Sequence, residues 1–168
     1  RLISFTDPWA DPLGVGYQLS NALMAFGRGE WFGTGLGHSV QKLSYLPEAH
    51  TDFMLAVLGE EFGFVGISIV IGLSFLMLAC CIKIGHRALK HHYLRAGYLA
   101  YGISIIFLLQ ILVNAGMNMG LMPTKGLTLP FISYGGTSLM MCAAMISLIL
   151  KIDASTQEVN PEREESNF

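Results

Sequence analysis

Charged residues are scarce in this sequence of 168 residues. They make up 13% of the chain, whereas soluble globular proteins carry about 25%. Hydrophobic residues make up 52%, and the mean hydropathy is +0.52. The shortage of charge excludes an ordinary soluble domain, and a net charge of −2 leaves no basic footprint of the kind that nucleic-acid-binding proteins carry. We therefore expect a membrane protein without a nucleic-acid partner.

Cysteine is also scarce, with three residues in the chain. Cys80, Cys81 and Cys142 all fall in apolar stretches, where a thiol behaves as a small apolar side chain. We therefore predict neither a disulfide framework nor a metal site. The first residues contain no initiator methionine and none of the features of a signal peptide, so we expect the sequence to begin inside a longer protein.

Long stretches without charge are what the sequence does contain. They run over 62–82, 96–122 and 126–150. Each is long enough to cross hydrocarbon as a helix, which takes roughly 20 residues. The first two predict transmembrane helices at 62–84 and 96–116.

The third stretch begins with residues that disfavour a regular helix. Proline removes a backbone donor, and glycine adds conformational freedom; these residues are Pro123, Pro130, Gly135 and Gly136. We therefore expect an ordered loop at 117–132 and a third transmembrane helix at 133–152. The predicted fold is an all-α, polytopic membrane protein.

Basic residues set the predicted orientation. The connector at 85–95 is rich in lysine, arginine and histidine, so the positive-inside rule places it in the cytoplasm. Residues 1–61 and the loop at 117–132 then form the periplasmic side. The polar tail at 153–168 returns to the cytoplasm, and its composition predicts disorder.

The first 61 residues form a large loop in which we expect short helices. Apolar residues at helical spacing predict an amphipathic helix at about 15–26. A glycine-rich run follows at 27–37. It lacks the G-x-G-x-x-G spacing and the flanking strand of a nucleotide-binding loop, so we exclude that function.

Ionisable residues gather in the motif at 45–53. Glu48, His50 and Asp52 follow Pro47, which fixes a turn. Thr51 can cap a helix that begins at Asp52. Two interpretations of Asp52 stay open: a carboxylate that complements the helix dipole, or a general base at the outer membrane surface.

Small residues follow Asp52 on one helical face, namely Ala56, Gly59, Gly63 and Gly66. Such a stripe lets a neighbouring helix approach closely.

Polar residues are few in the remaining spans. Gln110, Asn114 and Asn118 recur at steps of four, which places three amides on one stripe. We favour bonds to neighbouring protein over contact with a ligand. Lys125 stands alone in a long uncharged region; it either invites an anionic partner such as a phosphate or extends its ammonium to the membrane surface.

Two of these segments resemble a known family. The run at 123–138, preceded by Asn118 and Gly120, and the motif at 45–53, followed by Gly59-Glu60-Glu61, resemble the SEDS proteins of shape, elongation, division and sporulation. The likeness extends over about 8–152. Lys125 favours the division members, because elongation members usually carry an uncharged residue there.

The resemblance implies the C-terminal part of a ten-helix bundle and an inverting peptidoglycan glycosyltransferase. Such an enzyme polymerises lipid II at the outer face of the bacterial cytoplasmic (inner) membrane during septal cell-wall synthesis. Asp52 matches the catalytic general base. The resemblance assigns substrate or pyrophosphate binding to Lys125, Glu48, His50, Ser133 and Tyr134. It assigns structural roles to Pro47, Gly59, Gly63, Pro123, Pro130, Gly135 and Gly136.

One position departs from the pattern, since many division members have an acidic residue where this chain has Ser44. The implied partners are a class B penicillin-binding protein of the FtsI type and other divisome proteins. No cofactor is indicated, although a divalent cation such as Mg²⁺ is compatible with the chemistry. Two alternatives stay open: a lipid II flippase and a non-catalytic membrane scaffold of the divisome. We expect the 168 residues alone to be inactive.

Overall fold

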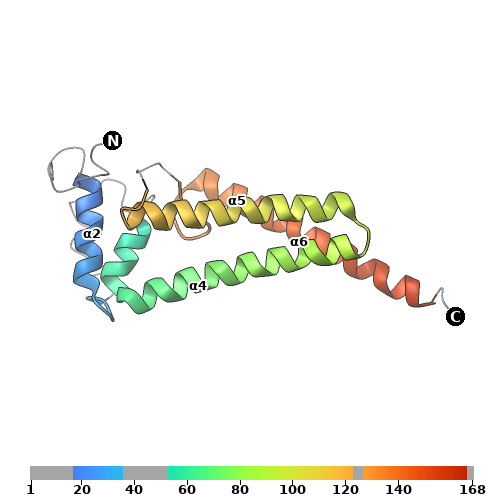
Figure 1. The fold of residues 1–168 in the computed structure, drawn as a ribbon, viewed down its shortest axis with the longest axis horizontal. Helices are drawn as coiled ribbons and strands as arrows, with labels where there is room; N and C mark the ends of the chain where they lie inside the picture. Colours follow the sequence, from blue (N-terminus) through green and yellow to red (C-terminus); the bar gives the residue numbers. More distant parts are fainter. Residues whose placement is uncertain (1–16, 36–52, 123–126, 166–168) are drawn as a thin grey trace. The chain divides into compact units, whose positions relative to one another are not determined.

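The computed structural model describes residues 17–35, 53–122 and 127–165 (Figure 1). The regular structure in these ranges is helical, with no strand, so the prediction of an all-α protein is confirmed. The helices are α2 (Tyr17–Gly29), α4 (Met54–Lys90), α5 (Leu94–Asn118) and α6 (Gly136–Glu165).

Three helices are long and apolar enough to cross a membrane, namely Met54–Lys90, Leu94–Asn118 and Gly136–Gln157. The predicted number of spans is therefore confirmed for the described part of the chain. The second span agrees with the prediction within two residues at each end, and the third begins three residues later than predicted. Gly136 starts α6 because the Pro and Gly residues before it do not continue a helix.

The chain divides into two compact units. The first contains α2, the part of α4 before Ser74, the part of α5 from Gln110, and the loop that follows. The second contains the rest of α4 and α5 together with α6.

The second unit has an apolar core drawn from three helices. It consists of Leu78, Cys81, Ala88, Ala100, Ile103, Phe107, Cys142, Ile149 and Ile152. Large apolar side chains on the other faces, such as Leu76 and Tyr98, are exposed. A bilayer solvates such faces without cost, so this core needs only to join the helices to one another.

The turn between α4 and α5 is shorter than the predicted connector at 85–95. Both helices extend into that range and leave three residues, 91–93, between them. The prediction of a loop was wrong because the end of an apolar stretch marks where hydrocarbon ends, whereas Lys, Arg, Leu and Ala continue a helix readily.

The turn itself has a defined backbone geometry. His92 adopts a positive φ of 66°, and its N–H donates to the Leu89 carbonyl at 3.0 Å. The N–H of Tyr93 donates to the Ala88 carbonyl at 3.0 Å, which completes a Schellman motif at the end of α4. The Tyr93 carbonyl then accepts from Gly97 at 2.9 Å and begins α5.

The tail predicted to be disordered from residue 153 is helical through Glu165. Asp153 accepts hydrogen bonds from Arg87 and Gln157, both at 2.8 Å, and Thr156 donates to the Ile152 carbonyl. A helix that already exists adds residues at little cost. The prediction of disorder, which was made from composition, was therefore wrong for 153–165.

In the first unit, α2 confirms the predicted amphipathic helix, with its described part starting at Tyr17 and ending three residues after the predicted end. Ala22 and Ala25 on its buried face pack against Phe53, Ala56 and Val57. A second cluster of Leu55, Ile67, Ile111 and Leu129 joins α4, the end of α5 and the loop before α6. This unit therefore contains the described neighbours of both predicted site motifs.

Candidate active site

The predicted site falls partly outside the described residues. Glu48, His50, Asp52 and Lys125, together with Pro47 and Pro123, belong to the segments that the structure leaves undescribed. The described candidates are Gly59, Gly63, Pro130, Ser133, Tyr134, Gly135 and Gly136. The surroundings of both motifs can be built from their described neighbours.

Helix α4 begins directly after the 45–53 motif. The Phe53 carbonyl accepts from the N–H groups of Ala56 and Val57, at 3.0 and 3.3 Å, and Met54 is the first helical residue. The predicted helix start at Asp52 was therefore two residues early. Phe53 is 2% exposed and belongs to the cluster with Ala22 and Ala25 of α2. The residue that follows Asp52 is thus anchored in the core of the first unit.

Helix α4 is interrupted at Gly63, where φ is 67° and ψ is −163°. In a regular helix the carbonyls of Glu60 and Glu61 would bond to the N–H groups of Phe64 and Val65. The break removes both bonds and leaves four backbone groups that need other partners. The sequence predicted one continuous helix here, and that prediction was wrong.

Residues 29–35, here called the bridging segment, supply all four partners. Thr34 donates to the Glu60 carbonyl from its N–H at 2.9 Å and from its hydroxyl at 3.0 Å. Gly35 donates to the Glu61 carbonyl at 3.1 Å. In return, the N–H groups of Phe64 and Val65 donate to the carbonyls of Glu30 and Trp31, at 2.9 and 3.2 Å respectively. An unsatisfied buried backbone group costs about 1–3 kcal/mol, so these bonds make the break tolerable.

Glycine is required where the two backbones meet. A Cβ on Gly33 would overlap the Glu61 carbonyl, and one on Gly63 would lie 2.5 Å from the Gly33 nitrogen. Both residues also have a positive φ, which a side chain disfavours. Within the glycine-rich run, Gly29 and Gly33 therefore serve a close backbone approach.

The predicted small-residue stripe is confirmed in part. A Cβ on Gly59 would lie 2.6 Å from the ring of Phe26, and Gly63 contacts the bridging segment. Gly66 faces only the Phe62 side chain of its own helix. The close neighbours of the stripe are thus α2 and the bridging segment.

Two acidic residues lie buried in this unit. Glu60 is 0% exposed, and Glu61 is also buried. The Arg28 guanidinium lies 3.7 Å from a Glu60 carboxylate oxygen, although the Arg28 side chain is 54% exposed. Carboxylates removed from water need cations or several donors. Two adjacent acids directly before an apolar span mark this pair in the sequence, but that pattern does not predict its burial.

An aromatic surface lies beside the bridging segment. A pocket of about 540 Å³ is lined by Glu30, Trp31 and Phe64. The two rings meet edge to face, with their centroids 5.5 Å apart. Exposed aromatic rings of this kind suit the level of lipid headgroups.

The amides of the α5 stripe have different hydrogen-bond partners. Asn114 donates to the Leu127 carbonyl at 2.7 Å, and Asn118 donates to the Asn114 carbonyl at 2.9 Å. The Asn114 bond agrees with the favoured interpretation, whereas the Asn118 bond stays within α5. Gln110 differs, because its side-chain oxygen is buried and has no hydrogen-bond partner in the described part of the chain.

The loop before α6 is closed by Ser133. Its hydroxyl oxygen accepts a bond from the Leu129 N–H at 2.9 Å, and its own N–H donates to the Leu129 carbonyl at 3.1 Å. Tyr134, by contrast, is 80% exposed and accessible to a ligand. Pro130 is buried directly after Leu129, which belongs to the core.

Among the described residues, no group of three His, Cys, Asp or Glu side chains could hold a metal ion.

Comparison with known proteins identifies this arrangement. The family model described as cell cycle protein, which covers FtsW, RodA and SpoVE, matches residues 1–158. The chain belongs to this family. The resemblance to the SEDS proteins is thereby confirmed.

Sequence identity to individual members of the FtsW/RodA/SpoVE family supports the same assignment. The chain is 94% identical, over 168 residues, to the probable peptidoglycan glycosyltransferase FtsW of Acinetobacter baylyi. It is 56% identical, over 153 residues, to the protein of the same name in Aliivibrio salmonicida. These alignments cover 100% and 91% of the chain but 42% and 38% of the two relatives. The chain therefore spans about two fifths of the length of these family members.

A solved structure supports the same fold. That structure is of a peptidoglycan synthase complex and concerns the structural coordination of polymerization and crosslinking. One of its chains matches with a TM-score of 0.70 and 30% identity, over 93% of this chain and 41% of that one. Together with the three apolar helices, these findings show a multi-pass membrane protein of the FtsW/RodA/SpoVE family.

Proposed function

We propose that the chain is the C-terminal part of a peptidoglycan glycosyltransferase of ten transmembrane helices, which polymerises lipid II during septal cell-wall synthesis. The observation that carries the proposal is the 94% identity to a protein named as a probable peptidoglycan glycosyltransferase. The matching chain in a peptidoglycan synthase complex supports it.

In the proposed reaction Asp52 is the general base. Its carboxylate takes the proton from the 4-hydroxyl of the acceptor sugar, whose oxygen attacks the anomeric carbon of the donor. The bond from that carbon to undecaprenyl pyrophosphate breaks, and Lys125 stabilises the charge on the leaving group. One base suffices for such an inverting transfer. Glu48, His50, Ser133 and Tyr134 are the proposed substrate contacts.

The surroundings of both motifs support this assignment. Phe53, directly after Asp52, is buried against α2. Leu127, two residues after Lys125, is held by the Asn114 amide. A base and a charge-stabilising group need fixed supports, because small displacements reduce the rate steeply.

The proposed location is the inner membrane at the division septum. The basic turn between α4 and α5 faces the cytoplasm, since lysine and arginine concentrate there. The Asp52 and Lys125 motifs then lie on the periplasmic side, and the C-terminus lies in the cytoplasm.

The proposed partner is a class B penicillin-binding protein of the FtsI type, together with other divisome proteins. The solved structure of a synthase complex supports a transpeptidase partner. Exposed apolar residues of α4, such as Ile69 and Leu73, offer a surface for a partner's transmembrane helix. A divalent cation such as Mg²⁺ would assist the departure of pyrophosphate. The same protein could act as a membrane scaffold of the divisome and as an enzyme, because a partner helix would bind the outer face of α4 and leave Asp52 and Lys125 to the substrate.

The proposal is tested with Asp52→Ala in the full-length protein, purified with its transpeptidase partner and supplied with lipid II. We expect glycan polymer to fall at least a hundredfold, since general bases contribute about 10²–10⁴ in rate. Asp153→Asn, a carboxylate change in the second unit, is the control and should retain synthesis. Undiminished polymer from Asp52→Ala would refute the general-base role.

The flippase alternative is measured in the same preparation. Transbilayer movement needs a polar path, but Asn114 and Asn118 already bond within the first unit. We therefore expect transport of lipid II to be unaffected by Asp52→Ala. Loss of transport with intact polymerisation would favour the flippase. The 168 residues alone are expected to make no polymer.

A further inference from the structure

Basic side chains gather around the α4–α5 turn of the second unit. Lys90 ends α4, Arg95 lies in the first turn of α5, and both are exposed. Arg87 is already paired with Asp153 at 2.8 Å. Asp153 is the one carboxylate among the side chains that the structure describes in this unit. Lys90 and Arg95 therefore have no carboxylate partner within that described set.

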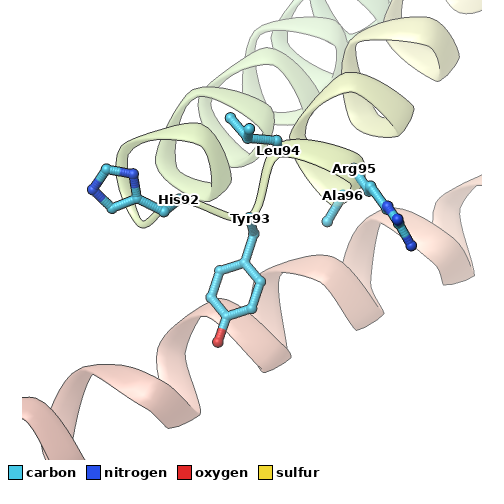
Figure 2. Close-up of a pocket in the computed structure, with 5 residues that line it drawn as sticks. All are labelled: His92, Tyr93, Leu94, Arg95 and Ala96. Carbon is cyan, nitrogen blue, oxygen red and sulfur yellow. The ribbon is translucent and has the colours of Figure 1, made fainter.

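A pocket of about 410 Å³ lies at this turn. Its lining consists of His92, Tyr93, Leu94, Arg95 and Ala96. Figure 2 shows Tyr93 directed toward α6, with His92 and Arg95 on either side of it. The backbone of the turn is fixed by the Schellman motif and by the Gly97–Tyr93 hydrogen bond. The lining residues are thus presented in a defined arrangement.

Apolar residues are exposed on the two spans that lead to the turn. Ile82 on α4, with Tyr98 and Leu99 on α5, are exposed. In a membrane such side chains contact acyl chains, so the turn beyond them lies at the level of the lipid headgroups. Leu94 is exposed at the pocket itself and can contact the first carbons of the acyl chains.

From this arrangement we propose that the α4–α5 turn binds the headgroup phosphate of an anionic phospholipid in the adjacent leaflet. Arg95 and Lys90 supply the positive charge, His92 and Tyr93 line the headgroup pocket, and Leu94 contacts the lipid's apolar part. Anionic phospholipids are the occupant because their phosphates are the abundant anions at this depth. The inference does not depend on the proposed enzymatic function.

The experiment uses the full-length protein in nanodiscs of phosphatidylcholine, titrated with fluorescent phosphatidylglycerol. Energy transfer from a dye attached near the turn reports binding. Each basic residue near a membrane surface contributes about 1 kcal/mol, which corresponds to roughly fivefold in affinity. We expect Arg95→Gln and Lys90→Gln each to weaken binding about fivefold and the double variant to weaken it about twenty-fivefold.

Lys83→Gln is the matched control, since Lys83 is exposed on α4 but lies about two helical turns before Lys90, away from the α4–α5 turn. It should leave the affinity within a factor of two. The proposal is overturned if the control weakens binding as much as Arg95→Gln, which would indicate a diffuse basic surface. Unchanged binding by the double variant would also overturn it. So would displacement of the lipid by equimolar glycerol 3-phosphate, which would identify a soluble phosphate ligand.

Discussion

The carbonyl oxygen of Glu60 accepts two hydrogen bonds from Thr34, one from its N–H and one from its hydroxyl. The two residues are 26 positions apart, and the contact satisfies a carbonyl left free by the break in α4 at Gly63. The bridging segment therefore holds the first part of α4, which directly follows Asp52, by hydrogen bonds on both sides of the break.

Gly33→Ala should open the contact between the bridging segment and α4. The added Cβ would overlap the Glu61 carbonyl at a position of positive φ. We expect the free energy of unfolding to fall by about 2–4 kcal/mol, because backbone hydrogen bonds between the two segments are lost and the backbone is strained. Thermal unfolding of the purified full-length protein measures the loss, and amide exchange at Phe64 and Val65 should accelerate.

Gly27→Ala is the control for that change. Its Cβ would meet nothing within 4 Å, and the residue lies inside α2. Alanine favours a helix over glycine by up to about 1 kcal/mol, so this variant should be as stable as the parent or more stable. Equal stability of Gly33→Ala and Gly27→Ala would contradict the close approach described here.

Thr34→Val should remove one of the two bonds to the Glu60 carbonyl and keep the backbone bond. The expected loss is about 1 kcal/mol in the free energy of unfolding. Thr34→Ser retains the hydroxyl and should stay close to the parent. If valine and serine give the same unfolding temperature, the hydroxyl bond contributes nothing to stability.

Asn114→Leu should release the loop that follows Lys125. The change removes the part-buried bond to the Leu127 carbonyl and leaves that acceptor without its amide donor. We expect a loss of about 1–2 kcal/mol in stability and faster amide exchange at Leu129 and Ser133. Under the proposed function, glycan polymerisation should fall as well.

Gln110→Leu provides the matched amide removal on the same helix stripe. Because the Gln110 oxygen is buried without a partner in the described structure, its loss should be neutral or stabilising. A larger loss of stability from Gln110→Leu than from Asn114→Leu would reverse this account of the amide stripe.

His92→Gly should stabilise the α4–α5 turn or leave it unchanged. His92 occupies the left-handed position of the Schellman motif, which glycine adopts without strain. A gain of up to about 1 kcal/mol is expected in thermal unfolding. His86→Gly, at an exposed position inside α4, should instead lose up to about 1 kcal/mol. Destabilisation of both variants to the same extent would show that the turn does not require this backbone conformation.

Much of the fold could be predicted because its signals are local. Apolar stretches of sufficient length specify spans, and the spacing of Leu19, Ala22 and Phe26 specifies the amphipathic helix α2. The run from 123 to 138 and the motif at 45–53 were enough to indicate the family, which the comparison confirmed. The roles assigned to Asp52 and Lys125 stay predictions.

Other features depended on partners distant in the sequence. The helical tail beyond residue 153 follows a helix already formed in the second unit, where Arg87 holds Asp153. Burial of Glu60 depends on the packing of α2 against α4, which no local pattern encodes.

The sequence by itself determined the number of spans, the amphipathic helix and the family, because hydrophobicity and motif chemistry act residue by residue. Only the tertiary structure decided that α4 breaks at Gly63 and that residues 29–35 fill the break. The physical reason is that a broken helix is stable only when its four free backbone groups find partners, and those partners come from a segment about thirty positions away.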